Sequence, residues 1–279
     1  MSAAPAIGLI AGAGRLPVEL ARGARRSGLA VHAIGLRALA EPALGEAASS
    51  CEWLYLGELE RLFASLRAAG AQQVVLAGKV PKTLLLHAGA PVRPDARARA
   101  LLAALPDRSD DSLLGALARA LAQEGYGLRS QLELVPGLVA SAGTWSAREP
   151  SAEEWSDIRF GWPIARALGA VDVGQTVVVQ GRAVLALEAI EGTDAEIERG
   201  LQLSARGRPA CVVKLAKPAQ DPRFDVPTIG LGTLRAIAAG GGSALAIEAG
   251  RTLALDRAEL PAFADSHGIA LVALAEPGA

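Results

Sequence analysis

Short apolar runs alternate with amphipathic helical patterns through the first half of the chain, and this order limits the folds open to it. Four runs have the length and composition of buried strands, at residues 7–12, 30–36, 52–56 and 73–77. The segment 58–69 repeats apolar side chains at the spacing of a helix face, and 17–27 and 109–124 are also predicted helices. Strands separated by helices become parallel through right-handed crossovers. The first half is therefore predicted to be a Rossmann-like open parallel sheet.

The second half is predicted to be a distinct α/β (α+β) domain. Apolar runs at 175–180 and 183–189 are split by Gly181 and Arg182, which predicts a β-hairpin with a two-residue turn. Further strands are expected at residues 210–213, 245–248 and 269–274. A chain of 279 residues exceeds the usual size of one core. The expected division is a nucleotide- or phosphate-binding domain at 1–140, an interdomain crossing at 141–163 and a catalytic domain at 164–279.

Composition indicates an ordinary globular protein. Apolar residues make up 51% and charged residues 20%, with a net charge of −1, so nucleic acid is not expected as a partner. Cys51 and Cys211 lie far apart in the sequence, which favours neither a disulfide framework nor a zinc site. The N-terminal apolar run lacks a preceding basic region, and no uninterrupted apolar stretch is long enough for a membrane span. A cytoplasmic protein with at most peripheral membrane contact is expected.

The stretch KLAKPAQDPRFDVPTIG, which begins at Lys214, places cations and carboxylates directly after an apolar run. Lys214, Lys217 and Arg223 could bind phosphate oxygens, and Asp221 and Asp225 could bind Mg²⁺ or activate water. This combination indicates phosphoryl chemistry. The alternative is a solvated loop in which the charges form incidental ion pairs.

A glycine-rich turn, GAGR, follows the first predicted strand. Gly12 and Gly14 would let backbone N–H groups approach a phosphate at the start of the next helix, beside Arg15. Lys79 follows a neighbouring strand and would approach the same edge of the sheet. Pro17 stands where a dinucleotide fingerprint needs its third glycine, and the second strand lacks an acidic residue at its end. Nucleotide or nucleotide-sugar binding is therefore favoured over NAD, with an ordinary turn as the alternative.

A third group of polar residues lies in EAIEGTDAEIERG, which begins at Glu188. Thr193 and Glu196 have the spacing of a capping box at a helix start. Glu188 ends an apolar strand, where an ionised carboxylate needs a partner. Gly192 would let a ligand reach the helix N-terminus. A substrate or metal role is predicted for some residue of this set, with Glu188 and Asp194 as the candidate metal ligands, whereas helix capping accounts for Thr193 and Glu196.

Taken together, these stretches resemble a known family. The sequences GLIAGAGRLP, RSDDSLL, VGQTVVVQGRAVLALEAIEGTDAEIERG and VVKLAKPAQDPRFDVPTIG are similar to those of the LpxI-type UDP-2,3-diacylglucosamine pyrophosphatases, and the resemblance covers nearly the whole chain. It implies a cytoplasmic hydrolase of lipid A biosynthesis, peripherally associated with the inner membrane. Such an enzyme would use Mg²⁺, or another divalent cation, to split UDP-2,3-diacylglucosamine into UMP and 2,3-diacylglucosamine 1-phosphate (lipid X). It also implies a homodimer, and a catalytic role for the aspartate of the RFD motif, here Asp225.

The residues and the resemblance together give a set of predicted roles. The expected catalytic residues are Asp225, Asp221 and Lys214. The expected metal ligands are Asp225, Asp194 and Glu188. The expected substrate-binding residues are Gly12, Gly14, Arg15, Lys79, Gln175, Thr176, Gly192, Thr193 and Arg223. Two alternatives remain open at this point: an NAD(P)-linked oxidoreductase, and a non-catalytic sensor of a nucleotide sugar or lipid.

Overall fold

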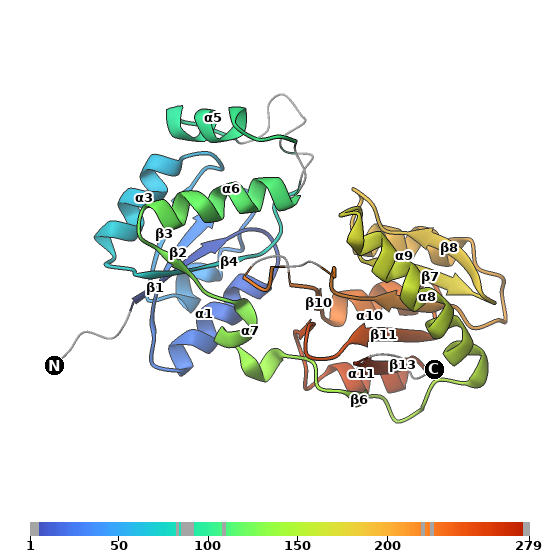
Figure 1. Ribbon diagram of the computed structural model, residues 1–279. Helices are drawn as coiled ribbons and strands as arrows, with labels where there is room; N and C mark the ends of the chain where they lie inside the picture. Colours follow the sequence, from blue (N-terminus) through green and yellow to red (C-terminus); the bar gives the residue numbers. More distant parts are fainter. Residues whose placement is uncertain are drawn as a thin grey trace. The chain divides into compact units, whose positions relative to one another are not determined.

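The computed structural model describes residues 6–81, 84, 92–107, 110–218, 221–223 and 226–275. The chain divides into two compact units, shown with their helices and strands in Figure 1. The first unit comprises Met1–Pro136 together with Asp221–Asp225, and the second comprises Gly137–Gln220 together with Val226–Ala279. Each contains its own α/β sheet, so the prediction of two α/β domains is confirmed.

The sheet of the first unit has five parallel strands in the order β3-β2-β1-β4-β5. The strands are β1 (Ala6–Ala11), β2 (Ala30–Leu36), β3 (Ser50–Leu54), β4 (Gln73–Ala77) and β5 (Gly127–Leu128). The helices are α1 (Leu16–Arg26), α2 (Leu44–Ala47), α3 (Leu59–Ala68), α5 (Ala96–Ala103), α6 (Asp110–Gln123) and α7 (Gln131–Leu134). The strand order reverses beside β1, and ligand sites of open α/β sheets lie outside the carboxyl ends of such strands.

Amphipathic helices bury this sheet. Leu62, Phe63 and Leu66 of α3 pack in one cluster with Ile10 and Ile34 of the central strands. Their spacing places all three on a single face of the helix, as the sequence pattern predicts. Helices α3 and α6 lie on one side of the sheet and α1 on the other (Figure 1). The predicted Rossmann-like parallel sheet is thus confirmed.

The second unit has a six-stranded mixed sheet in the order β6-β13-β11-β9-β7-β8. Its strands are β6 (Gly143–Thr144), β7 (Thr176–Gln180), β8 (Ala183–Leu187), β9 (Cys211–Lys214), β11 (Ala244–Glu248) and β13 (Ala270–Leu274). Strands β9, β11 and β13 are parallel, whereas β6 and the β7–β8 hairpin run antiparallel to their neighbours. The remaining elements are α8 (Ala152–Ala170), α9 (Thr193–Gln202), α10 (Leu231–Ala239), α11 (Leu260–Ser266), the short pair β10 (Thr228–Ile229) and β12 (Leu253–Ala254), and the 3-10 turn η1 (Pro136–Leu138).

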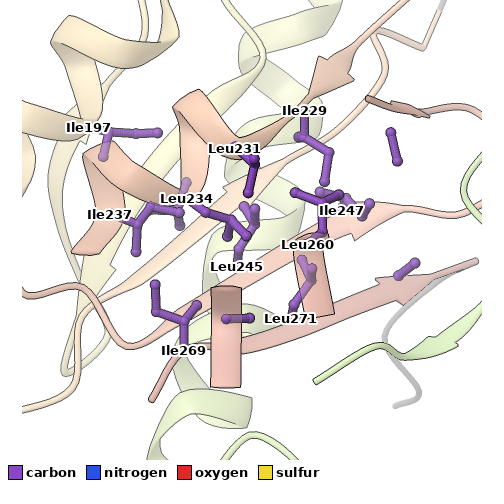
Figure 2. Packing of buried hydrophobic residues seen from close by; sticks show 14 of the residues in the cluster. Ile197, Ile229, Leu231, Leu234, Ile237, Leu245, Ile247, Leu260, Ile269 and Leu271 are labelled. Carbon is purple, nitrogen blue, oxygen red and sulfur yellow. The ribbon is translucent and has the colours of Figure 1, made fainter. Parts of the chain in front are cut away.

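Both faces of the second sheet are buried. On one face, Leu245 and Leu271 of the strands contact a cluster that includes Ile197 of α9 and Leu234 of α10 (Figure 2). Alternate strand residues, with Ile158 and Trp162 of α8, form a second cluster. Because side chains alternate across a strand, a sheet covered on both faces has nearly continuous apolar strands. The strand sequences LAI and LVAL have that character.

The predicted hairpin is confirmed. Gly181 and Arg182 both have φ of 58°, the left-handed conformation that two-residue hairpin turns require. The buried carboxylate of Asp157 in α8 accepts hydrogen bonds from the backbone N–H groups of both turn residues, at 2.9 and 2.6 Å. A helix on one face of the sheet therefore holds the turn.

Two domain assignments differ from the structure. Residues 141–163, predicted as an interdomain crossing, form β6 and the first two-thirds of α8, which packs into the second core. The sequence signal for that helix is the capping box of Ser151 and Glu154, in which each side chain bonds the other residue's backbone N–H. Asp221–Asp225 belongs to the first unit, although it lies within the range 164–279 predicted for the second domain.

None of the helices within the described residues is long and apolar enough to span a bilayer.

Candidate functional site

Five polar side chains meet in the second unit where β9 ends at Lys214. Thr176 lies opposite Lys214 in the neighbouring strand β7, Glu188 follows β8, and Thr193 and Glu196 lie in the first turns of α9. All five are buried, with Lys214 only 3% and Glu188 only 8% exposed. These residues form the Lys214 cluster. Their strand and helix ends bring them together from positions as much as 38 residues apart in the sequence.

Glu188 is the acceptor at the centre of the Lys214 cluster. Its carboxylate accepts hydrogen bonds from the hydroxyls of Thr176 and Thr193, both at 2.7 Å, and from the backbone N–H of Gln175 at 3.1 Å. The Lys214 ammonium donates to the Thr193 hydroxyl at 2.7 Å. Burial alone would raise the pKa of Glu188, but the charge of Lys214 and the three hydrogen bonds lower the pKa below its ordinary value. Glu188 is therefore an ionised carboxylate beside an ammonium group.

Glu196 has the opposite protonation behaviour in the same cluster. Its side chain is fully buried, and neither carboxyl oxygen has a hydrogen-bond partner among the described residues. Burial, and then the negative charge of Glu188, raise the pKa of Glu196 to about 8. Glu196 is therefore mainly protonated at neutral pH, so that the two carboxyl groups and one ammonium carry almost no net charge.

The predicted capping box of Thr193 and Glu196 is wrong. The N-cap of α9 is Gly192, with φ of 84°, and no side chain of the described residues caps the helix. The Thr193 hydroxyl instead bonds Glu188 and Lys214. Hydrogen bonds to charged groups are about twice as strong as those to neutral ones, which explains why Thr193 contacts the ion pair and does not cap the backbone.

The segment after β9 contains the other predicted catalytic residues. Lys217 donates to Asp172 at 2.5 Å within the second unit. In the first unit, the Arg223 guanidinium pairs with both carboxylate oxygens of Asp221. This pairing lowers the pKa of Asp221. The backbone carbonyl of Pro222 accepts a hydrogen bond from Ser130 at 2.9 Å.

The predicted metal ligands are not brought together within the described part of the chain. Glu188 uses both carboxylate oxygens in hydrogen bonds and lies beside Lys214. Asp194 is exposed in the first turn of α9. Asp225, the residue expected to be essential, lies outside the described residues. No group of three His, Cys, Asp or Glu side chains suited to a metal ion occurs among the residues that are described.

The glycine turn and Lys79 meet at the carboxyl ends of β1 and β4. Ala13 and Lys79 exchange backbone hydrogen bonds at 2.8 and 2.9 Å, and the N–H of Gly12 donates to Ala77 at 2.8 Å. A side chain at Gly12 would place its Cβ 2.6 Å from the carbonyl oxygen of Lys79. The lack of a side chain at Gly12 therefore allows the two backbone segments to approach this closely. Because the N–H of Gly12 already donates to Ala77, it does not fit the predicted phosphate contact. Gly14, Arg15 and Lys79 are exposed at the same edge.

One polar network was not predicted. Glu248 ends β11 and is buried, and it contacts Arg166, Arg251 and the backbone of Ala216. The available signal was a glutamate directly after an apolar strand, as in LALE for Glu188 and LAIE for Glu248. Such a carboxylate needs partners when it is buried.

The two sheets and the buried lysine–glutamate cluster define a two-domain α/β protein with a charged centre in its second domain. Residues 6–138 match the model of the LpxI N-terminal domain, and residues 141–272 match that of the LpxI C-terminal domain. The chain belongs to the LpxI family. It is 35% identical over 272 residues to the UDP-2,3-diacylglucosamine pyrophosphatase LpxI of Caulobacter vibrioides (strain ATCC 19089 / CIP 103742 / CB 15). The matched region covers 94% of this chain and 95% of that relative.

Similarity to solved structures is weak. Glycinamide-RNase-transformylase T from Mycobacterium tuberculosis is 18% identical, with a TM-score of 0.24 over 74% of this chain and 46% of that one. The biotin carboxylase subunit of pyruvate carboxylase is 12% identical, with a TM-score of 0.27 over 66% and 38%. The chain spans less than half the length of either structure, and TM-scores this low carry no argument about function.

Proposed function

We propose that the protein hydrolyses the diphosphate of UDP-2,3-diacylglucosamine to UMP and 2,3-diacylglucosamine 1-phosphate in lipid A biosynthesis. The observation that carries this proposal is the 35% identity, over 94% of the chain, to a relative named for that pyrophosphatase activity. Both domains of the chain match the same family. The chemistry requires positive charge near the diphosphate oxygens and a water molecule aligned with the attacked phosphorus.

Each unit, taken by itself, contains groups suited to part of this chemistry. In the first unit, Gly14, Arg15 and Lys79 are exposed where a sheet of this kind binds phosphate. Arg223 and its partner Asp221 belong to the same unit, and Asp225 is proposed to orient water or bind a cation. These assignments rest on residue chemistry and on the family resemblance.

The Lys214 cluster is the proposed contribution of the second unit. Lys214 is buried, bonded to Thr193 and balanced in charge by Glu188, so its proposed role is that of a fixed cation which a substrate phosphate would share with Glu188. It lies at the start of α9, where the helix dipole also favours an anion. Gln175, Thr176, Gly192 and Thr193 surround this charge and are the proposed substrate-binding residues of the unit. A buried charge acts more strongly on a nearby anion than one in water does.

A divalent cation, with Mg²⁺ as the expected ion, is part of the proposal. Mg²⁺ suits hard oxygen ligands and commonly binds through one or two carboxylates plus substrate phosphates. Glu188 does not fit such a ligand, because its oxygens accept three hydrogen bonds and face Lys214. Asp225, together with the diphosphate of the substrate, is the proposed binding group.

A product assay tests the function. Purified protein is incubated with UDP-2,3-diacylglucosamine, and UMP and the lipid phosphate are measured by chromatography and mass spectrometry. We expect stoichiometric amounts of both products, loss of turnover in EDTA and recovery with added Mg²⁺. Substrate binding without UMP release would support a sensor and contradict the enzyme, whereas full activity in EDTA would contradict only the cation proposal.

Peripheral contact with the inner membrane surface and assembly as a homodimer are also proposed. Exposed apolar side chains occur at Val171 and Val173, before β7, at Leu187, the last residue of β8, and at Ile190, after β8. Apolar residues gathered on a surface are suited to lipid or protein contact. Co-sedimentation with lipid vesicles and light scattering after size-exclusion chromatography test the two proposals separately. A monomer that does not bind vesicles would contradict both.

A further inference from the structure

The segment that leaves β9 is held by an ionic network around the buried Glu248 in the second unit. The Glu248 carboxylate accepts the backbone N–H of Ala216 at 2.9 Å and two N–H groups of Arg166 at 3.1 and 3.2 Å. Arg251 donates to the same carboxylate at 3.3 Å. Glu248 is only 5% exposed, so its charge depends on these partners for compensation.

The two arginines also bond the backbone of the segment directly. Arg166 donates to the carbonyl of Ala216 at 3.3 Å, and Arg251 donates to the carbonyl of Lys217 at 2.9 Å. Ala216 is thus bonded at both its N–H and its carbonyl, and the neighbouring Lys217 at its carbonyl. Both ends of the segment are anchored by side chains as well, Lys214 on Thr193 and Lys217 on Asp172.

We propose that Glu248 is a positioning residue for Lys214 and Lys217. Together with Arg166 and Arg251, it fixes the backbone between the two lysines and so fixes where their ammonium groups lie. This inference rests on the proposed function, because the positions of these cations matter for turnover only if the substrate is a polyanion such as a diphosphate. Misplacement of catalytic groups by about 1 Å can cost roughly 100-fold in rate.

The variant Glu248→Gln tests the proposal. Glutamine keeps the shape and one acceptor oxygen but removes the charge that the two arginines share. We expect kcat to fall about 10-fold to 100-fold while KM changes much less, since the substrate-contacting side chains are all retained.

Lysine labelling gives a second readout that does not depend on activity. The chain has only four lysines, Lys79, Lys82, Lys214 and Lys217. Lys214 and Lys217 are buried, so both should react slowly with an amine reagent in the native protein, whereas Lys79 is exposed and serves as internal reference. In Glu248→Gln, mass spectrometry should show labelling of Lys214 and Lys217 accelerated several-fold relative to Lys79.

Glu154→Gln is a matched control. Glu154 is equally buried in the same unit, accepts two N–H groups of one arginine, Arg148, both at 2.8 Å, and accepts one backbone N–H, that of Ser151. Replacement of the Glu154 carboxylate should lower the stability of the protein but leave lysine labelling and kcat unchanged. If Glu248→Gln does not fold, Arg251→Gln removes the bond to the Lys217 carbonyl and one bond to Glu248, leaves the contacts of Arg166 in place, and should still accelerate labelling of Lys217.

The outcomes separate this inference from the proposed function. Unchanged labelling in folded Glu248→Gln, or in Arg251→Gln, would overturn the positioning role whether or not the protein is a pyrophosphatase. Accelerated labelling with unchanged kcat would overturn the link between the lysine positions and turnover. If the wild-type protein releases no UMP, the proposed function fails, and the labelling result still decides whether Glu248 positions the lysines.

Discussion

Two glutamates beside the same lysine differ in protonation state because their hydrogen bonds differ. Glu188 has three donors and a lowered pKa, whereas Glu196 has no partner among the described residues and a pKa raised to about 8. Burial disfavours the charged form of both, and only at Glu188 do the hydrogen bonds and the charge of Lys214 outweigh it; the charges of Arg199 and Lys214 are not enough to do so at Glu196. The identity of a side chain therefore does not determine its charge in this cluster.

Glu196 should make stability depend on pH. In the folded protein its pKa is about 8, against 4.5 as the ordinary value, so folding favours the protonated form. This stabilisation is complete below about pH 4.5 and is lost as pH rises through about 8, with a total on the order of a few kcal/mol. Glu196→Gln has no such titration and should be more stable than wild type at pH 9.

Urea unfolding of both proteins between pH 5 and 9 measures the difference. The groups around Glu196 are Glu188, Glu191, Arg199 and Lys214, and all of them remain in the variant. Glu198→Gln, an exposed change in the same helix, is the control and should follow the wild-type curve. If the difference in free energy of unfolding between the wild type and Glu196→Gln does not change with pH, the protonated state of Glu196 is contradicted.

Asp225→Asn tests the residue expected to be essential. The change keeps the shape of the side chain and removes the negative charge that cation binding or water activation needs. Turnover should fall by at least about 100-fold, with substrate binding largely retained. Steady-state UMP release and a separate binding titration measure the two effects. Turnover close to that of wild type would remove Asp225 from the proposed mechanism.

At the scale of elements, the β7–β8 hairpin depends on a helix residue. Asp157 of α8 accepts both N–H groups of the turn, and Arg182 adopts a positive φ that costs energy for a residue with a side chain. Asp157→Ala should therefore lower the free energy of unfolding by about 2 kcal/mol. Arg159→Ala, an exposed change in the same helix, is the control for urea unfolding. Equal stability of the two variants would contradict this role.

Local patterns predicted most of these elements. The predicted strands at 30–36 and 73–77 coincide with β2 and β4, and the hairpin turn was found from Gly181 and Arg182. The periodicity of apolar residues and the residue types that form turns are local signals, so both can be recognised in the sequence. Helix α8 was missed because glycines and Pro163 obscured its pattern, although Ser151 and Glu154 marked its start.

The site was predicted less completely, because its geometry depends on contacts between distant segments. The sequence identified Glu188, Thr193 and Lys214 as polar residues at strand and helix ends, and the structure brings them together. It did not indicate that Thr193 bonds both of the others, or that the buried carboxyl of Glu196 has no hydrogen-bond partner among the described residues. Such pairings are fixed by the relative placement of β7, β9 and α9, which no local pattern specifies.

At the scale of the whole molecule, the chain enters the first unit twice. Asp221–Asp225 belongs to that unit, although the residues before and after it belong to the second. Ser130 and the backbone carbonyl of Pro222 provide one contact of this returning segment. The protein therefore cannot be divided into its two units by cutting the chain at one point.

A fragment that ends at Pro136 would accordingly be an incomplete domain, lacking five residues of its own fold. Adding the missing peptide as a separate molecule should raise the melting temperature of the fragment, and a peptide with the same composition in scrambled order should not. Thermal melting of the fragment with either peptide measures this, and identical melting temperatures would contradict the assignment. Separate expression or exchange of the halves between relatives would thus have to transfer a short internal stretch along with the N-terminal half.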